Sequence, residues 1–206
     1  MKKNQYNHIA FVYDHLSLVL GKSYRESKNA FLEELKDGDK VLFLGGGTGK
    51  NLTSILPRIG ETGKVFFVEA SSRMIEKAME KVPSIFHSRI VFLHQSKFSA
   101  IPGEIFDFVL TQYFLDILPD KEIHQLFESV NLRSHKNTKW IFVDFFETKG
   151  KRWLLNLMVY FFRIITRNPR KDLPVFDRYF GQYGWNISQK KIFDQDFIQA
   201  WLLRKQ

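Results

Sequence analysis

The sequence contains no cysteine. This absence excludes disulfide bonds, thiolate metal sites and a cysteine nucleophile, and it fits a reducing compartment. The first eight residues are polar and lack the apolar core of a secretion signal. No stretch reaches the ~18 uninterrupted apolar residues that predict a membrane-spanning helix. We therefore expect a cytoplasmic protein that is soluble, or at most peripheral to a membrane.

The six histidines show no pairing at i, i+4 and no cluster with acidic residues, so the sequence predicts no metal site. The chain has 206 residues, of which 44% are hydrophobic and 16% aromatic. That length and composition suffice for one folded domain with a full core. The formal net charge of +9 favours anionic partners such as nucleic acid, phospholipid surfaces or phosphorylated metabolites.

Short apolar runs alternate with helix-like segments along most of the chain. The apolar runs, which predict strands, are 41–44, 65–68, 90–93, 106–110 and 140–143. The segments between them predict helices over about 50–59, 72–82 and 119–134. Strands without polar alternation suit a sheet that is covered on both faces, and the alternation with helices predicts parallel βαβ units.

The two ends of the chain follow other patterns. Residues 6–36 predict two helices separated near Gly21, and 37–39 predict a turn. After the last parallel strand we expect helices over about 151–166 and 173–182, the second closing at Gly181 or Gly184. Two further strands, about 185–193 and 196–204, are spaced for a hairpin. We therefore expect one domain over 1–206, with a helical cap at 1–36, a cofactor-binding core at 37–145 and a lid helix with closing strands at 146–206.

A glycine-rich loop follows the first predicted strand directly, and a helix follows the loop. Such a loop lets a ligand approach the backbone, and the helix offers free N–H groups. A phosphate-binding P-loop needs G-x4-G-K-[ST], but Leu44 and Asn51 stand at its first glycine and its hydroxyl residue. A dinucleotide fingerprint needs a third glycine, where Lys50 or Leu52 stands. Both of these ligand classes are therefore excluded.

The remaining pattern is h-h-x-h-G-x-G-x-G, which 41–49 fill. Glu69 stands at the end of the second strand, 20 residues past Gly49, where a carboxylate can accept hydrogen bonds from both hydroxyls of a ribose. The run 70–74 follows, with a serine placed to cap the next helix. Together these motifs resemble those of the class I S-adenosylmethionine-dependent methyltransferases of the small-molecule type, and the resemblance covers about residues 6–145.

The resemblance implies a Rossmann-like, doubly wound α/β fold. Its seven-stranded sheet would have the order 3-2-1-4-5-7-6, with strand 7 antiparallel and helices on both faces. It implies S-adenosylmethionine as cofactor and S-adenosylhomocysteine as product. The implied cofactor-binding residues are Gly45, Gly46, Gly47, Gly49, Glu69, Ala70, Met74, Ser96, Lys97 and Gln112.

Two positions depart from the family pattern. Family members usually carry an acid two residues before the first glycine, where this chain has Phe43, and an Asp after the third strand, where it has Ser96. Each lost charge-assisted contact is worth about 1–3 kcal/mol. The departures leave an alternative open, in which the chain keeps the fold without the activity and serves as a binding or membrane-surface accessory protein.

Methyl transfer from a sulfonium is a direct displacement, so the protein mainly aligns and desolvates its two substrates. The acceptor implied by the resemblance is a small molecule, and no obligatory catalytic triad is expected. Side chains expected near the reacting carbon are Tyr13 and Asp14 in the first helix and Tyr113 and Asp116 after the fourth strand. For each of them a shape-defining role is an alternative to proton transfer.

Residues 151–171 contain six basic residues and no acidic one. They enclose an apolar, aromatic run at 153–162. A helix of this composition suits an anionic bilayer surface or the cover of a site for a lipophilic acceptor. A core helix with solvated ends and a homodimer contact remain alternatives. No RNA-binding module or stacking platform is evident, which disfavours nucleic acid as the partner.

Overall fold

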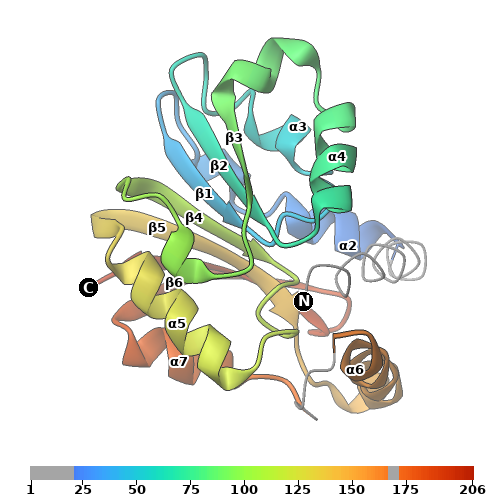
Figure 1. Ribbon diagram of the computed structural model, residues 1–206. Helices are drawn as coiled ribbons and strands as arrows, with labels where there is room; N and C mark the ends of the chain where they lie inside the picture. Colours follow the sequence, from blue (N-terminus) through green and yellow to red (C-terminus); the bar gives the residue numbers. More distant parts are fainter. Residues whose placement is uncertain (1–20, 167–171) are drawn as a thin grey trace.

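Seven strands form one sheet in the order β3-β2-β1-β4-β5-β7-β6 (Figure 1). The computed structural model describes residues 21–166 and 172–206. The strands are β1 (Lys40–Leu44), β2 (Lys64–Glu69), β3 (Ile90–His94), β4 (Phe106–Gln112), β5 (Ser134–Phe145), β6 (Trp185–Phe193) and β7 (Ile198–Lys205). The first five are parallel to one another, and β7 is antiparallel to both β5 and β6. This is the expected class I methyltransferase sheet, and the β6–β7 hairpin is confirmed.

Helices cover both faces of this sheet (Figure 1). In chain order they are α2 (Gly21–Lys28), α3 (Leu52–Ile55), α4 (Ser72–Lys81), α5 (Asp120–Asn131), α6 (Arg152–Thr166) and α7 (Phe176–Gln182). Four short 3-10 turns complete the elements of the described residues: η2 (Leu32–Glu34), η3 (Ser84–Arg89), η4 (Phe98–Ala100) and η5 (Lys149–Lys151). Helices α2, α3 and α4 lie on one side of the sheet, and α5 and α7 lie on the other.

Alternate residues of the strands supply two separate cores. On β1 and β2 the residues of odd number, such as Val41 and Phe67, belong to the core beneath α3 and α4. Those of even number, such as Leu42 and Phe66, belong to the core beneath α5 and α7. This division follows from the two-residue period of a strand, and it explains why the apolar runs show no polar alternation.

Three helices are shorter than the sequence predicts, and each has an identifiable cause. Regular helix ends at Ile55, two residues before Pro57, which has no backbone N–H to continue the helical hydrogen bonds. Pro174 likewise delays the start of α7 to Phe176. The helix expected to reach residue 36 ends at Lys28, whose carbonyl oxygen accepts hydrogen bonds from two side chains of other elements. The remainder of the expected cap, 1–20, lies outside the described residues.

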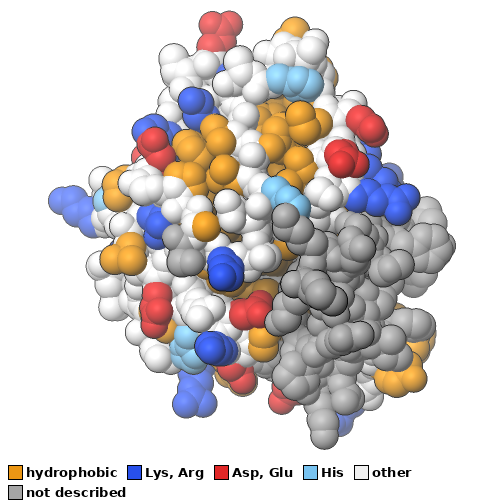
Figure 2. Space-filling view, in the orientation of Figure 1, with side chains coloured by type: hydrophobic (Ala, Val, Ile, Leu, Met, Phe, Trp, Pro, Cys, Tyr) orange, Lys and Arg blue, Asp and Glu red, His pale blue; other side chains and the backbone are white. Residues whose placement is uncertain are grey.

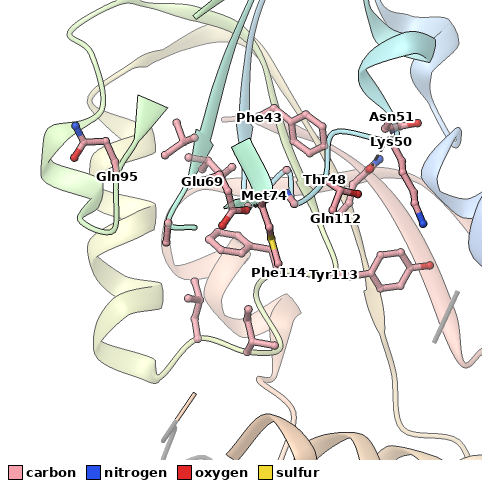
Figure 3. A pocket seen from close by; sticks show the side chains of 18 of the residues that line it. Phe43, Thr48, Lys50, Asn51, Glu69, Met74, Gln95, Gln112, Tyr113 and Phe114 are labelled. Carbon is pink, nitrogen blue, oxygen red and sulfur yellow. Dashed lines mark hydrogen bonds between the residues drawn. The ribbon is translucent and has the colours of Figure 1, made fainter. Parts of the chain in front are cut away.

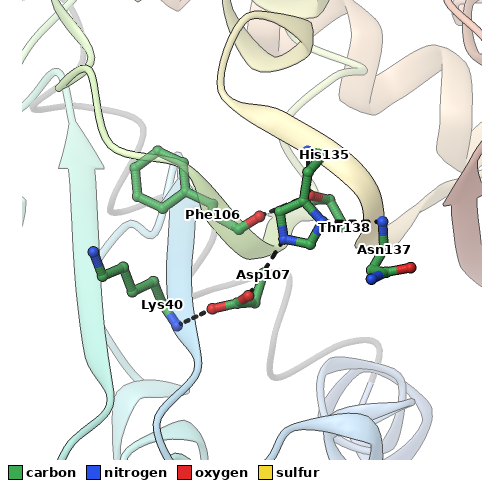
Figure 4. Close-up of polar contacts among 6 residues, drawn as sticks. All are labelled: Lys40, Phe106, Asp107, His135, Asn137 and Thr138. Carbon is green, nitrogen blue, oxygen red and sulfur yellow. Dashed lines mark hydrogen bonds and ion pairs between the residues drawn. The ribbon is translucent and has the colours of Figure 1, made fainter.

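The edge of the sheet away from the glycine loop is held by a polar network (Figure 4). The backbone N–H of Lys40 on β1 donates to Asp107 on β4 at 2.9 Å. The same carboxylate lies 3.5 Å from His135 at the start of β5. Thr138 donates its hydroxyl to the carbonyl oxygen of Phe106 at 2.7 Å. These contacts tie three neighbouring strands together at their amino ends, opposite the edge at which ligands bind in such sheets.

Candidate functional site

A pocket opens at the carboxyl ends of β1, β2 and β4 (Figure 3). This is the point where the strand order reverses, which is the usual ligand site of an open α/β sheet. Its polar lining consists of Lys28, Thr48, Lys50, Asn51, Glu69, Gln95, Ser96, Gln112 and Glu122. Its apolar lining includes Phe43, Leu44, Val68, Met74, Phe98, Phe114, Ile117 and Leu118, and Tyr24 and Tyr113 complete one wall.

Glu69 is the centre of this pocket's polar structure. Its Oε2 atom accepts the backbone N–H of Gly47 at 3.0 Å, and its Oε1 atom accepts that of Ser71 at 2.9 Å. The side chain thus joins the glycine loop of β1 to the turn after β2. Gly47 has a φ of +59°, and no other atom lies within 4 Å of the position that a Cβ would take there. The loop is therefore open above Gly47, where a ligand can approach the backbone.

Burial raises the pKa of the Glu69 carboxyl, and the backbone N–H groups of Ser71, Gly47 and Ala70 oppose the shift. Burial penalises the charged form, while hydrogen bonds from N–H groups stabilise it. A ligand that offers hydroxyl donors to this carboxylate would add stabilisation of the same kind. The group is therefore placed to accept hydrogen bonds from a polar ligand that fills the pocket.

Helix α4 begins directly behind this carboxylate. Ser71 caps it, since the Ser71 hydroxyl accepts the backbone N–H of Met74 at 3.3 Å. Met74 is buried on the first turn and lines the pocket, as does Ala70. The predicted cap is confirmed, and the run 70–74 forms one side of the pocket.

The last glycine of the loop has a different place from the first three. Gly45, Gly46 and Gly47 line the pocket, whereas Gly49 does not. Gly49 has a φ of +66°, and a Cβ there would lie 2.6 Å from the Cβ of Ala78 on α4. Gly49 therefore allows the loop to pack against α4, and its role is close packing.

The turn after β3 contributes Gln95 and Ser96 to the lining. The backbone N–H of Gln95 donates to the carbonyl oxygen of Glu69 at 3.0 Å, which holds this turn beside the end of β2. Lys97 precedes η4 and lies outside the residues that line the pocket. The resemblance to the family therefore predicts the turn after β3 and Ser96 as pocket residues, but it does not identify Gln95.

Phe43 lines the pocket from within β1 and is only 2% exposed. Its ring packs edge-to-face on Phe67 of β2, with the centroids 5.5 Å apart. An aromatic pair thus occupies the place where the family usually has a carboxylate. The pocket is apolar at this point.

Tyr113 connects the end of β4 to α2. Its φ is +55°, which is uncommon for a residue with a side chain. The hydroxyl groups of Tyr113 and Ser27 lie 2.5 Å apart, and the ring stacks on Tyr24 at 4.5 Å. Burial raises the pKa of Tyr113 well above its usual range, so its phenol stays protonated at neutral pH. Of the two predicted roles, this geometry favours shaping the pocket over accepting a proton.

Two pocket residues hold the end of α2. Asn51 and Gln112 each donate a side-chain N–H to the carbonyl oxygen of Lys28, both at 2.8 Å. Asn51 also donates to the Gln112 side-chain oxygen at 3.1 Å. Lys28 places its ammonium over the ring of Tyr24, 4.6 Å from its centroid. No local pattern in the sequence identifies these contacts, because they join residues 23 and 84 positions apart.

Asp116 is buried outside the pocket lining, beside Asp144 at the end of β5. Asp144 accepts the backbone N–H groups of Leu115 at 3.2 Å, Asp116 at 3.4 Å and Phe145 at 2.9 Å. Burial and the charge of Asp116 raise the pKa of Asp144 well above its usual range. The Asp144 carboxyl group thus holds the loop after β4. The other two candidates, Tyr13 and Asp14, lie outside the described residues.

The opposite wall of the pocket is aromatic. The ring of Phe114 lies directly on Gly45, where a Cβ would approach it to 2.2 Å, and Phe98 packs on it edge-to-face at 6.2 Å. A buried carboxylate, loop N–H groups and aromatic walls thus meet in one cavity. This combination can hold a ligand with a polar end and an apolar or aromatic end, and it can align that ligand with a second molecule.

Residues 41–133 match the protein family described as the methyltransferase domain. A protein-L-isoaspartate O-methyltransferase of Fervidobacterium nodosum is 28% identical over 94 residues, which are 45% of this chain and 47% of that protein. The chain therefore aligns with less than half of the length of this curated relative. Residues 41–133, which match the family, hold the glycine loop, Glu69 and β4.

Solved structures share the whole architecture. A SAM-dependent methyltransferase from Aquifex aeolicus has a TM-score of 0.65 at 17% identity, over 92% of this chain and 93% of that one. The mitomycin 7-O-methyltransferase MmcR has a TM-score of 0.69 at 14% identity, over 89% of this chain and 54% of that one. NcsB1, an O-methyltransferase solved with S-adenosylmethionine and 2-hydroxy-5-methyl naphthoic acid, has a TM-score of 0.67 at 11% identity. The match covers 96% of this chain and 57% of that one. At these identities the likeness establishes the fold.

Proposed function

We propose that this chain, which has the class I methyltransferase fold and matches the methyltransferase domain family over 41–133, transfers a methyl group from S-adenosylmethionine to a small lipophilic acceptor. We take residues 1–206 to act as one domain. The residues proposed to hold the cofactor are Gly45, Gly46, Gly47, Glu69, Ala70, Met74, Ser96 and Gln112. Gly49 supports this loop through its packing, and Lys97 is left without a role at the pocket.

The observation that carries the proposal is the position of the Glu69 carboxylate. It lies at the end of β2, next to the strand that bears the glycine loop, and already accepts one N–H from that loop. A ribose there offers two hydroxyl donors to the carboxylate, which would offset the cost of its burial.

The acceptor class follows from the walls of the pocket. Phe98, Phe114, Ile117 and Leu118 give it an apolar side, and Phe43 adds to this. The phenol of Tyr113 stays protonated and the chain has no thiol, so neither group supplies a base. In this proposal the protein contributes mainly alignment and exclusion of water. NcsB1, which has the same fold and was solved with S-adenosylmethionine and 2-hydroxy-5-methyl naphthoic acid, supports the choice of an aromatic acceptor.

The test has two stages. Thermal unfolding is first followed with S-adenosylmethionine and with S-adenosylhomocysteine. NAD, a dinucleotide with a pyrophosphate group, serves as the control ligand. We expect the first two to raise the unfolding temperature and NAD to leave it unchanged. Transfer of a labelled methyl group to a panel of hydroxylated and carboxylated aromatic compounds then tests turnover. Cofactor binding without transfer to any acceptor of the panel would favour the alternative of a binding protein that keeps the fold.

A further inference from the structure

Helix α6 has two apolar faces. Leu154, Leu155 and Met158 are buried in the core that also contains Tyr113 and Ile117, which line the pocket. On its outer face, Trp153 is 68% exposed, Leu157 45% and Tyr160 58%. Figure 2 shows orange side chains protruding at the lower right, in the region where Figure 1 places α6. A helix packed on a core normally turns a polar face outward, so this surface calls for a partner.

The three exposed residues form one stripe. They occupy positions i, i+4 and i+7 of the helix, and at about 100° per residue they span only about 60° of its circumference. The centre of the buried face lies roughly 140° away from this stripe by the same geometry. The exposed side chains therefore point in one direction, away from the core.

The stripe alone is smaller than one side of a specific protein–protein interface. A specific interface buries roughly 800 Å² on each partner. Three side chains of this size supply at most about 200 Å² each. A bilayer makes no such demand, because it accepts a narrow apolar stripe into its headgroup region. Tryptophan and tyrosine are the residues that favour this boundary.

Charge supports an anionic bilayer. Residues 149–171 contain seven basic residues and no acidic one. Lys151 pairs with Asp194 and Arg152 with Glu147. The segment contains five further basic residues, of which Arg163, Arg167, Arg170 and Lys171 enter the argument by their charge in the sequence alone. Basic residues near a helix that lies on the surface are attracted to anionic headgroups. Within 21–166 and 172–206, no helix is long and apolar enough to cross a membrane, which fits a helix lying along the surface.

We propose that α6 binds the surface of an anionic bilayer, with Trp153, Leu157 and Tyr160 inserted between the headgroups. The proposal deepens the proposed function and rests on it for one point, namely that a lipophilic acceptor reaches the pocket from the membrane. The attachment of α6 itself does not depend on methyl transfer.

Tryptophan fluorescence tests the attachment directly. Trp140, Trp185 and Trp201 are at most 3% exposed, so Trp153 is the tryptophan that water reaches. The full chain is titrated with vesicles of phosphatidylcholine alone and of phosphatidylcholine with 30% phosphatidylglycerol. We expect a blue shift and reduced acrylamide quenching with the anionic vesicles, and at least about tenfold weaker binding to the neutral ones. Equal binding to both vesicle types, or no change in emission, would overturn the proposal.

Paired variants locate the contact. Trp153→Ser with Leu157→Ser should weaken co-sedimentation with anionic vesicles by about tenfold or more, because two inserted side chains are lost. Ile85→Ser with Leu132→Ser is the matched control, since these residues are 76% and 78% exposed elsewhere on the surface. The control should bind vesicles within about twofold of the wild type. Equal losses in both variants would contradict an attachment through α6.

Three further readouts separate the explanations. Sedimentation velocity without lipid reports the oligomeric state, and a dimer that only the α6 variant abolishes would assign the stripe to a second copy and overturn the proposal. Circular dichroism shows whether each variant keeps its fold, and titration of the wild type with S-adenosylhomocysteine tests the proposed function separately. Vesicle binding that fails while this ligand still binds refutes the attachment alone, whereas the reverse result refutes the proposed function alone.

Discussion

The Glu69 carboxylate accepts the backbone N–H of Gly47 at 3.0 Å, across 22 positions of the chain. The contact joins the end of β2 to the loop that follows β1, so one buried side chain sets the shape of the glycine loop. The carboxylate that we propose as the ribose acceptor is thus also part of the loop's own structure. Variants of Glu69 should affect both the ligand and the loop.

The titration of Glu69 predicts a pH dependence of binding. Burial raises the pKa of this carboxyl above the ordinary glutamate value of about 4.3, and only the carboxylate can accept both ribose hydroxyls. The affinity for S-adenosylhomocysteine should therefore increase as the pH rises through this raised pKa. Calorimetric titrations between pH 5 and pH 8 measure it. Glu69→Gln should bind S-adenosylhomocysteine more weakly, and its affinity should depend less on pH. Glu76→Gln, on the exposed side of α4, is the control and should follow the wild type. If the affinity of Glu69→Gln depends on pH as that of the wild type does, Glu69 does not have this role.

Gly49→Ala tests the packing of the loop on α4. The substitution places a Cβ 2.6 Å from that of Ala78 at a φ of +66°, so both crowding and backbone strain oppose it. We expect the free energy of unfolding to fall by about 1–3 kcal/mol. Gly150→Ala is the matched control, because no atom lies within 4 Å of its added Cβ. Urea unfolding of both variants decides the point, and equal stability of the two would show that the loop can relax.

The contact between Ser27 and Tyr113 predicts an energetic link between α2 and the pocket. Ser27→Ala and Tyr113→Phe each remove one member of a buried hydrogen bond of 2.5 Å. Each should lower the free energy of unfolding by about 1–2 kcal/mol, and the double variant should lose less than the sum. The exposed Ser84→Ala serves as the control. Strict additivity of the two losses, measured by urea unfolding, would mean that the hydroxyls do not interact.

Asp116→Asn should alter the dependence of stability on pH. Burial and the charge of Asp116 hold the pKa of Asp144 above that of an unfolded aspartate, about 3.9. The folded state then binds the proton more tightly than the unfolded state does. The stability from this group is fully present below the unfolded pKa and is lost as the pH rises through the folded one.

Removing the charge at residue 116 lowers the pKa of Asp144, so this loss should become smaller and shift to lower pH. Urea unfolding at a series of pH values compares Asp116→Asn with the wild type. Asp37→Asn, on the exposed turn before β1, provides the comparison for a carboxylate outside this pair. A profile identical to that of the wild type would show that the two carboxyl groups are independent.

Local patterns in the sequence predict the sheet and the centre of the pocket. Buried parallel strands are continuous apolar runs, and the glycine loop with Glu69 is a short motif at fixed spacing. The end of α2 is not predictable in this way, because the Lys28 carbonyl is taken by the side chains of Asn51 and Gln112 from distant positions. The burial of Asp116 beside Asp144 likewise depends on β4 and β5 being neighbours in the sheet.

Calorimetric titration of S-adenosylhomocysteine into the wild type and Glu69→Ala tests the central claim most directly. We predict saturable binding of one ligand per chain in the micromolar range for the wild type. Glu69→Ala should lose at least about 2 kcal/mol, or about thirtyfold in affinity, because the ribose hydroxyls and the Gly47 N–H lose a charged acceptor. No binding to the wild type, or equal binding to both proteins, would contradict the account.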